Sequence, residues 1–202
     1  MNMIRSICVY CGSSPGNDPS YLEAARAFGS ILAEHRISLV YGGGSRGLMG
    51  TLAGAVHDRG GRVVGIIPEF LRTRERMFTG ANEIIVTHDM HERKRLMFER
   101  ADAFVALPGG IGTMEELVEQ LTWSQLGRHR KPILIVNISG FWDPLIELLD
   151  HMKRLGFIHS ELLVDYRVVT RVEDILPELE AVLARRPEEE PLAGAAAVIE
   201  KL

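Results

Sequence analysis

The chain has 202 residues, of which 46% are hydrophobic and 25% charged, and its formal net charge is -4. These are values of an ordinary globular protein, and no overall positive field would draw it to nucleic acid or to an anionic membrane. No run of about 18 apolar residues predicts a membrane span, and the first residues lack the layout of a signal peptide. Two cysteines without a secretory signal indicate a reducing compartment. We therefore expect a cytoplasmic protein without nucleic-acid or membrane partners.

Apolar runs of strand length alternate along the chain with longer stretches of helical periodicity. The apolar runs predict strands at 6–12, 37–43, 62–68, 83–88, 103–110, 131–137 and 166–170. The stretches between them predict helices at 18–35, 47–61, 90–101, 113–127, 143–156 and 172–184. Val/Ile/Leu runs that are bounded by helices are typical of a parallel sheet buried on both faces. The sequence therefore predicts an α/β fold, a Rossmann-like three-layer sandwich with a mostly parallel sheet.

One domain accounts for almost all of this pattern, because no internal repeat and no linker interrupts it. In its first helix, Asp18 is a candidate N-cap and Pro19 suits the first turn. Near the C-terminus a charge run and a proline replace the apolar pattern. We expect a single nucleotide-binding catalytic domain over residues 1–186 and a tail over 187–202.

Three loops rich in small residues follow predicted strands and open onto predicted helices. They read CGSSPGN at 11–17, GGGSRGLMG at 42–50 and PGGIGT at 108–113. Ligands of open parallel sheets bind beyond the carboxyl ends of the strands. Unpaired N–H groups at a helix start favour a phosphate, and glycine lets the phosphate approach the backbone. Three such loops at one edge predict a phosphorylated ligand.

The second loop also permits a different interpretation. Gly42, Gly44 and Gly47 spell G-x-G-x-x-G, and Glu69 lies near the end of the next strand, as in a dinucleotide fingerprint. However, this loop follows the second predicted strand, and a further phosphate-type loop lies at 108–113. No hydride-transfer site is evident downstream, so nicotinamide binding is the weaker hypothesis.

Two adjacent carboxylates follow the third loop. Thr113 and Glu116 have the T-x-x-E spacing of a capping box, in which Glu116 would bond the Thr113 N–H. Glu115 would then only favour the helix dipole. Alternatively, carboxylates within one turn of a phosphate-binding loop lie near the sugar of a bound nucleotide, and Glu119 could share their face.

The predicted helix at 90–101 carries four cations: Arg93, Lys94, Arg95 and Arg100. Arg95 and Arg100 fit surface ion pairs with Glu92 and Glu99. Arg93 and Lys94 lie nearer the helix start, where a cation opposes the helix dipole. Their placement against the local field indicates an anionic partner.

These segments together resemble one known family. PGGIGTMEE at 108–116 is similar to the P-G-G-x-G-T-x-x-E motif of the LONELY GUY family, the cytokinin-activating phosphoribohydrolases. MHERK at 90–94 resembles that family's M-H-x-R-K segment, and CVYCGSS and GGGSRGLMG resemble its other loops. The resemblance extends from about residue 4 to about residue 180.

The resemblance implies a hydrolase for the N-glycosidic bond of N6-modified adenosine 5'-monophosphates or AMP, which releases the base and ribose 5-phosphate. It also implies a homodimer. The family's catalytic pair falls on Arg93 and Glu116. The expected substrate-binding residues are Gly12, Ser13, Gly43, Gly44, Ser45, Gly47, Met49, Glu75, Met90, Lys94, Gly109, Gly110, Ile111, Gly112, Thr113, Glu115 and Thr122.

The chemistry of the residues agrees with this implication. Cleavage of a ribosyl–nitrogen bond builds positive charge on the sugar, which a carboxylate stabilises or attacks through an activated water. An arginine holds a phosphate or a departing group without losing its charge. The reaction requires neither a metal nor a redox cofactor, and we expect none. The preferred base, prenylated adenine or adenine, stays open.

Three other functions are weaker hypotheses. Proteins of this kind are often labelled lysine decarboxylases, a reaction that needs pyridoxal phosphate on a lysine, and only Lys94 lies near the predicted site. Cys8 and Cys11 form C-x-x-C, but Cys8 lies within a strand, so a buried thiol is favoured over a redox pair. His88 and His91 lack a third metal ligand nearby in sequence.

Two further expectations concern partners and turnover. Met97, Phe98, Leu121 and Trp123 exceed the apolar surface that one helix face needs, which predicts a dimer interface on the helices at 89–100 and 113–126. The alternative to an enzyme is a nucleotide-binding or carrier module of the same fold without turnover.

Overall fold

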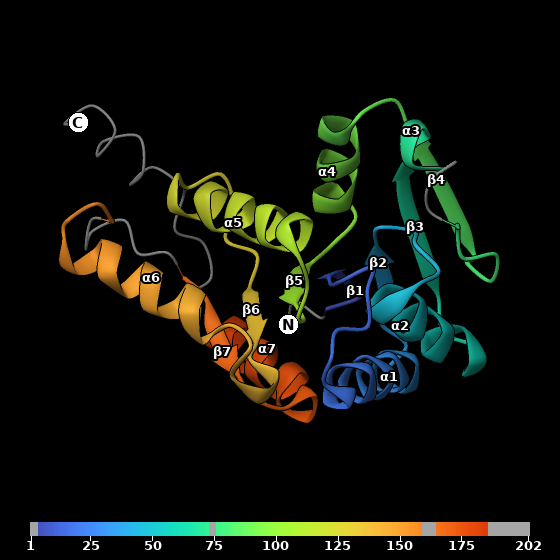
Figure 1. Cartoon of the computed structure of the whole chain (residues 1–202), viewed down its shortest axis with the longest axis horizontal. Coiled ribbons are helices and arrows are strands. Elements are labelled where there is room, and N and C mark those ends of the chain that lie inside the picture. Colours follow the sequence, from blue (N-terminus) through green and yellow to red (C-terminus); the bar gives the residue numbers. More distant parts are fainter. Residues whose placement is uncertain (1–3, 73–75, 159–164, 186–202) are drawn as a thin grey trace.

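The centre of the protein is a parallel sheet (Figure 1). The computed structural model describes residues 4–72, 76–158 and 165–185. Within these ranges the sheet has seven strands: β1 (Ser6–Tyr10), β2 (Ser38–Tyr41), β3 (Val63–Pro68), β4 (Glu83–Thr87), β5 (Ala103–Ala106), β6 (Ile133–Val136) and β7 (Arg167–Val169). Their order is β4-β3-β2-β1-β5-β6-β7, and every neighbouring pair is parallel. The strand order therefore reverses at β1, between β2 and β5.

Helices connect successive strands and cover both faces of the sheet. They are α1 (Pro19–Glu34), α2 (Gly47–Asp58), α3 (Glu69–Arg72), α4 (Met90–Glu99), α5 (Ile111–Gln125), α6 (Asp143–Arg154) and α7 (Ile175–Ala184). Short 3-10 turns at Ile138–Gly140 and Val172–Asp174 precede α6 and α7. The predicted α/β fold with a parallel sheet is confirmed. The sequence did not predict α3 or the two 3-10 turns, which are too short to show a period.

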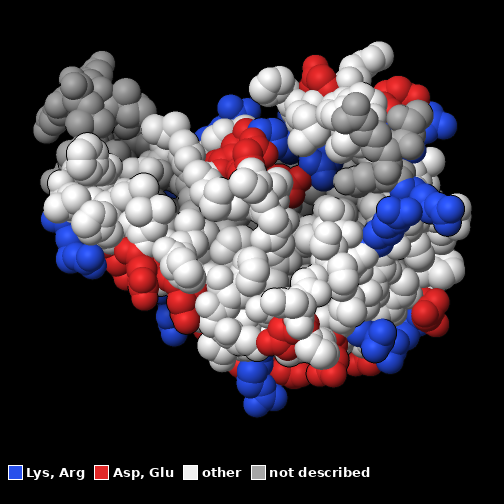
Figure 2. Space-filling view, in the orientation of Figure 1, with Lys and Arg blue, Asp and Glu red and all other residues white. Residues whose placement is uncertain are grey.

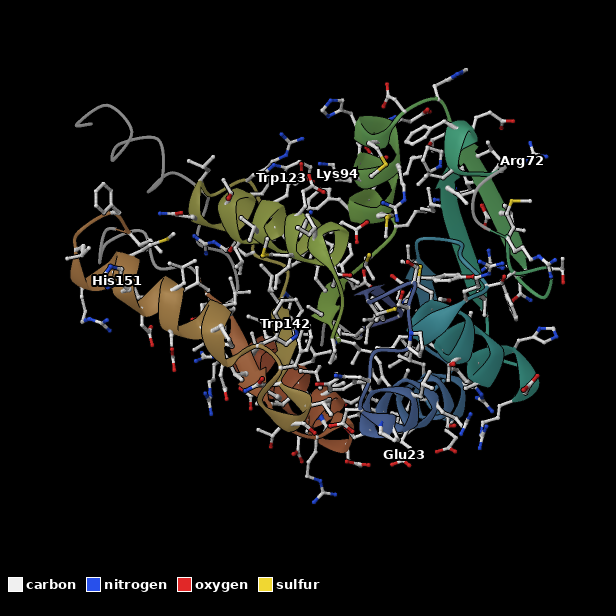
Figure 3. The ribbon with its side chains drawn as sticks, in the orientation of Figure 1. Glu23, Arg72, Lys94, Trp123, Trp142 and His151 are labelled. Carbon is white, nitrogen blue, oxygen red and sulfur yellow. The ribbon has the colours of Figure 1, made fainter. Side chains whose placement is uncertain are left out.

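The strands send alternate side chains into two separate cores. In β1, Ile7 and Val9 face a core shared with α1, α2 and α7, whereas Cys8 and Tyr10 face a core shared with α4, α5 and α6. Figure 1 shows α1, α2 and α7 below the sheet and α4 and α5 above it, and Figure 3 shows side chains filling the space between. Because both faces are covered, the strands read as continuous apolar runs.

Helix α1 forms as its sequence predicts. The Asp18 carboxylate accepts a hydrogen bond from the Ser20 N–H at 2.9 Å, and Pro19 occupies the first turn. Its buried stripe packs directly on α2, so closely that a Cβ on Gly29 would lie 2.6 Å from the Leu52 carbonyl oxygen. In the first core, the backbones of α1 and α2 are therefore in close contact at Gly29.

Two further expectations concern the C-terminal tail and membrane-spanning helices. The proposed tail at 187–202 lies outside the described residues. Among the residues that are described, no helix combines the length and the apolar character needed to cross a membrane.

Candidate active site

The three glycine loops meet at the carboxyl edge of the sheet, where they follow β1, β2 and β5. The Gly12 N–H donates to the Pro108 carbonyl at 3.0 Å, and the Met49 N–H donates to the Gly12 carbonyl at 3.2 Å. Gly47 has a φ of +58° and packs against the backbone of Ser13, where a side chain would collide. The loops thus support one another, as sequence reasoning from the strand ends predicted.

Gly42 has a different role from the one that the fingerprint suggested. A Cβ at this position would collide with the guanidinium of Arg93. Gly43 has a φ of +80°, which favours glycine, and Gly44 forms a bridge with Met77. The first glycine of G-x-G-x-x-G therefore makes room for an arginine from α4, a purpose that spacing alone did not reveal.

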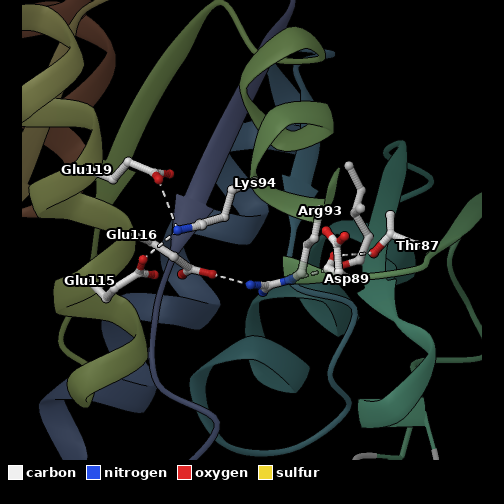
Figure 4. A network of polar contacts seen from close by, with 8 residues as sticks. Thr87, Asp89, Arg93, Lys94, Glu115, Glu116 and Glu119 are labelled. Atoms are coloured by element: carbon white, nitrogen blue, oxygen red, sulfur yellow. Dashed lines mark hydrogen bonds and ion pairs between the residues drawn. The ribbon is translucent and has the colours of Figure 1, made fainter. Parts of the chain in front are cut away.

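Arg93 of α4 is buried. Its guanidinium lies between Gly42, in the loop after β2, and Glu116 of α5. The Asp89 carboxylate caps α4 by accepting from the Glu92 N–H at 2.8 Å, which fixes where the helix begins. One turn on, the Arg93 Nε donates to the carbonyl of Ile66 in β3 at 3.1 Å. Its Nη1 lies 2.5 Å from Glu116 Oε1 (Figure 4).

Glu116 does not form the capping box that its spacing allowed. Helix α5 begins at Ile111, two residues before Thr113, and Gly110 is its N-cap, so both Thr113 and Glu116 lie inside the helix. Both are buried, and the Glu116 carboxylate is bonded to Arg93. Burial raises the pKa of Glu116, and the positive charge of Arg93 opposes this rise without cancelling it. The carboxylate therefore has an environment typical of functional acids rather than of helix caps.

A second set of ion pairs lies beside the first. Lys94 Nζ bonds Glu115 Oε1 at 2.5 Å and Glu119 Oε1 at 2.9 Å, so two carboxylates one turn apart on α5 hold one ammonium from α4 (Figure 4). Figure 2 shows acidic and basic side chains together at the surface where α4 and α5 approach each other. Sequence reasoning placed Glu119 on this face, but it did not find the bond to Lys94.

The remaining candidate substrate-binding residues lie outside the ion pairs and make separate contacts. Gly109 packs against the Thr113 side chain, and a Cβ on Gly110 or Gly112 would meet open space. The Ser45 N–H donates to the Arg76 carbonyl. Ile111 is exposed at the start of α5, and Met90 opens α4. The Thr122 hydroxyl donates to the Val118 carbonyl of its own helix, and Glu75 lies outside the described residues.

Some predicted contacts around the site are different in the structure. Arg95 pairs with Glu99 as expected, but Arg100 pairs with Glu83 of β4 at 2.9 Å. Glu92 instead accepts from the His88 N–H. These pairings depend on which strand lies beside the helix. The sequence pattern of a single helix does not give this information.

The cysteine prediction is confirmed. Cys8 and Cys11 are buried free thiols, and burial raises the pKa of both, which disfavours a reactive thiolate. In the described ranges, no three His, Cys, Asp or Glu side chains gather as a metal site would require.

The fold and this edge of the sheet define a class of protein: a Rossmann-like α/β domain with glycine loops at the carboxyl ends of its strands. Beside these loops, cations of α4, which follows β4, are bonded to carboxylates of α5, which follows the third glycine loop.

Comparison with known proteins identifies the family. Residues 49–179 match the family model described as "Possible lysine decarboxylase". The cytokinin riboside 5'-monophosphate phosphoribohydrolase LOG of Oryza sativa subsp. japonica is 46% identical over 186 residues, which are 89% of this chain and 77% of that protein. A cytokinin riboside 5'-monophosphate phosphoribohydrolase of Rhodococcoides fascians is 48% identical over 76% of this chain and 78% of its own length. The chain belongs to the LONELY GUY (LOG) family.

Solved structures support the fold. The molybdenum cofactor binding protein of Rippkaea orientalis superposes with a TM-score of 0.68, over 91% of this chain and 99% of that one. The two sequences are only 18% identical, so this likeness concerns the fold alone.

Proposed function

We propose that this protein hydrolyses the N-glycosidic bond of adenosine 5'-monophosphates, including N6-modified ones, to the free base and ribose 5-phosphate. The observation that carries the proposal is the buried ion pair between Arg93 and Glu116 beside three glycine loops. Both residues lie in the motifs by which the chain resembles its family, and the phosphoribohydrolases named above are 46% and 48% identical to it.

The proposed roles follow from charge and position. Water supplies the hydroxyl that bonds to the ribose C1', and the C1'–N bond breaks as the base takes up a proton. Glu116 faces the positive charge that develops on the ribose or removes the proton from water. Arg93 holds the base or the phosphate by a charge-assisted hydrogen bond. No redox step occurs, so the proposed reaction needs no cofactor.

We place the nucleotide phosphate between the 43–49 and 109–113 loops. The start of α5 supports this, because the N-cap Gly110 has no side chain to bond the first N–H groups of the helix. The remaining predicted contacts, from Gly12 to Thr122, are assigned to the same nucleotide. A phosphate, sulfate or AMP bound at the opposite edge of the sheet would contradict this placement.

We also propose a homodimer, with a corrected interface. Met97 and Leu121, which the sequence assigned to the interface, are buried in the core of their own chain. The exposed apolar residues of α5 and its C-cap lie on another side of the helix, at Ile111, Met114, Val118 and Leu126. Helix α6 and the turn after it expose Leu148, Leu155 and Phe157. A monomer at micromolar concentration in light scattering would contradict the dimer.

We further propose that the protein works in the cytoplasm. Cys8 and Cys11 are both free thiols, as is usual in a reducing compartment.

The test of the function is direct. The purified protein is incubated with AMP and with isopentenyladenosine monophosphate, and free base and ribose 5-phosphate are measured by chromatography. We expect equal amounts of the two products from at least one nucleotide. The matched control is Arg95→Ala, which removes a cation from the exposed Arg95–Glu99 pair of the same helix and should leave the rate unchanged. Binding of both nucleotides without release of base would favour the carrier alternative.

A further inference from the structure

The bridge between α4 and α5 has an inner and an outer part. In the inner part, Arg93 and Glu116 have side chains that are each 6% exposed, and one cation meets one anion. In the outer part, Lys94 meets two anions, Glu115 and Glu119. The inner pair is balanced, whereas the outer group carries one negative charge in excess.

The two outer carboxylates are not equivalent. The Glu115 side chain is 49% exposed, but that of Glu119 is only 22% exposed. The second oxygen of Glu119 is buried and has no hydrogen-bond partner among the described residues. A buried carboxylate needs its counter-charge more than an exposed one does. Glu119 is therefore the lasting partner of Lys94, and Glu115 is the carboxylate that can leave.

The difference in burial between Glu115 and Glu119 matters because of where Glu115 lies. Glu115 lies one turn from the start of α5, next to Glu116, and is the outer carboxylate closer to the 109–113 loop. An exposed carboxylate there can accept hydrogen bonds from ribose hydroxyl groups only if it is not held by Lys94. With Glu119 alone as partner, Lys94 stays paired and desolvation is compensated.

We propose that Glu119 is a positioning residue that retains Lys94 when Glu115 turns from Lys94 to the sugar of the bound nucleotide. This inference rests on the proposed function, since it takes ribose 5-phosphate as the part of the nucleotide that Glu115 contacts. Without the charge of Glu119, Glu115 must stay with Lys94, and the sugar loses a hydrogen-bond acceptor.

The burial of Lys94 agrees with this role. Desolvation lowers the pKa of Lys94, but hydrogen bonds to Glu115 and Glu119 more than offset it, so that the pKa is raised. Lys94 therefore remains a cation over the neutral pH range and always requires at least one anion.

The test is the dissociation constant of ribose 5-phosphate, measured by calorimetry. This ligand is a product, so the measurement does not depend on turnover. We expect Glu119→Gln to weaken binding at least about fivefold, the loss of one charge-assisted hydrogen bond, and Glu119→Asp to restore part of it. In a Glu115→Gln background, Glu119→Gln should weaken binding less than about twofold, because the residue it releases is already absent. Glu99→Gln, from the exposed pair on α4, is the matched control and should bind normally.

Three results would overturn the inference: normal binding by Glu119→Gln, an equal loss in both backgrounds, or no binding of ribose 5-phosphate to the unmodified protein. A change in melting temperature without a change in the dissociation constant would show that Glu119 is only structural. Failure of the proposed hydrolysis is distinguishable, because it appears as no base release while ribose 5-phosphate binding responds to the variants as expected.

Discussion

Each face of the sheet has an apolar core, but the helix pairs α1–α2 and α4–α5 are joined in different ways. On one face, α1 and α2 approach until Gly29 lies against the backbone of Leu52, and apolar side chains fill the remaining space. On the other face, α4 and α5 are joined by buried and half-buried ion pairs. Close apolar packing tolerates little movement, whereas ion pairs can exchange one partner for another.

The difference indicates how the molecule separates stability from chemistry. Desolvation of paired charges makes a buried ion pair a weak source of stability compared with apolar packing. We therefore expect the charges on the α4–α5 side to act on a bound ligand rather than to stabilise the fold. The α1–α2 side holds the strands and loops at fixed positions.

The largest effect is expected on the charged face. Arg93→Ala leaves the Glu116 carboxylate buried without its counter-charge, and breaking such a pair costs about 3–5 kcal/mol of unfolding free energy unless the carboxyl takes up a proton. Base release should fall at least about 100-fold, because the proposed contact of the guanidinium with the reacting nucleotide is lost. Urea unfolding and initial rates of base release measure both. Arg95→Ala should change neither, and loss of stability without loss of rate would make Arg93 a structural residue.

On the packed face, the same substitution should have opposite effects at two positions. Gly29→Ala places a Cβ 2.6 Å from the Leu52 carbonyl oxygen and should lower the unfolding free energy by about 1–3 kcal/mol. Gly54→Ala on α2 meets no atom within 4 Å and should raise it by about 0.5–1 kcal/mol. Neither variant should change the rate of base release per folded molecule. Equal effects on stability would refute the close approach of α1 and α2.

Gly42 lies in the loop after β2, where a change in packing would displace Arg93 of the α4–α5 ion pairs. Its Ala variant places a Cβ against the Arg93 guanidinium, so the arginine must move from Glu116. We expect base release to fall about tenfold, as for a misplaced catalytic group, and the melting temperature to fall less than in Arg93→Ala, because Glu116 loses only part of its counter-charge. If Gly42 instead served a bound phosphate, the dissociation constant of ribose 5-phosphate would rise as much as the rate falls.

A smaller effect concerns pH. Burial raises the pKa of Glu116, so its ionised form is lost, as pH falls, above the ordinary glutamate value of about 4.3. The proposed role needs the carboxylate, and kcat/KM should therefore decline on the acid side at a pH higher than that value. A profile that stays flat down to pH 4 would show that the ionisation of Glu116 does not limit the reaction.

Much of the fold could be read from the sequence, because the strands of a parallel sheet covered on both faces are short apolar runs, and stretches of helical period separate them here. The candidate site was predictable as far as local motifs reach, namely the three loops and the residues Arg93 and Glu116. The start of α5 was not, because Gly110 replaces Thr113 as N-cap and thereby turns Glu116 from a cap into a buried ion-pair partner.

Other features depend on contacts between elements that are distant in sequence. On α5, Leu117 and Leu121 are buried, whereas the neighbouring Val118 is exposed. Arg100 meets Glu83 because β4 lies beside α4, and Gly42 is constrained by Arg93, 51 positions away along the chain. Periodicity reports which face of a helix is apolar, but it does not report which neighbour that face meets.

The most direct test of the catalytic pair is the rate of ribose 5-phosphate release by Glu116→Gln at saturating nucleotide, measured together with a thermal melt. Gln keeps the shape of Glu116, and its amide oxygen can still accept a hydrogen bond from Arg93. If the negative charge stabilises the developing ribosyl cation, the rate should fall at least about 100-fold in a protein that remains folded. A folded Glu116→Gln protein with a rate near that of the unmodified enzyme would contradict the assignment.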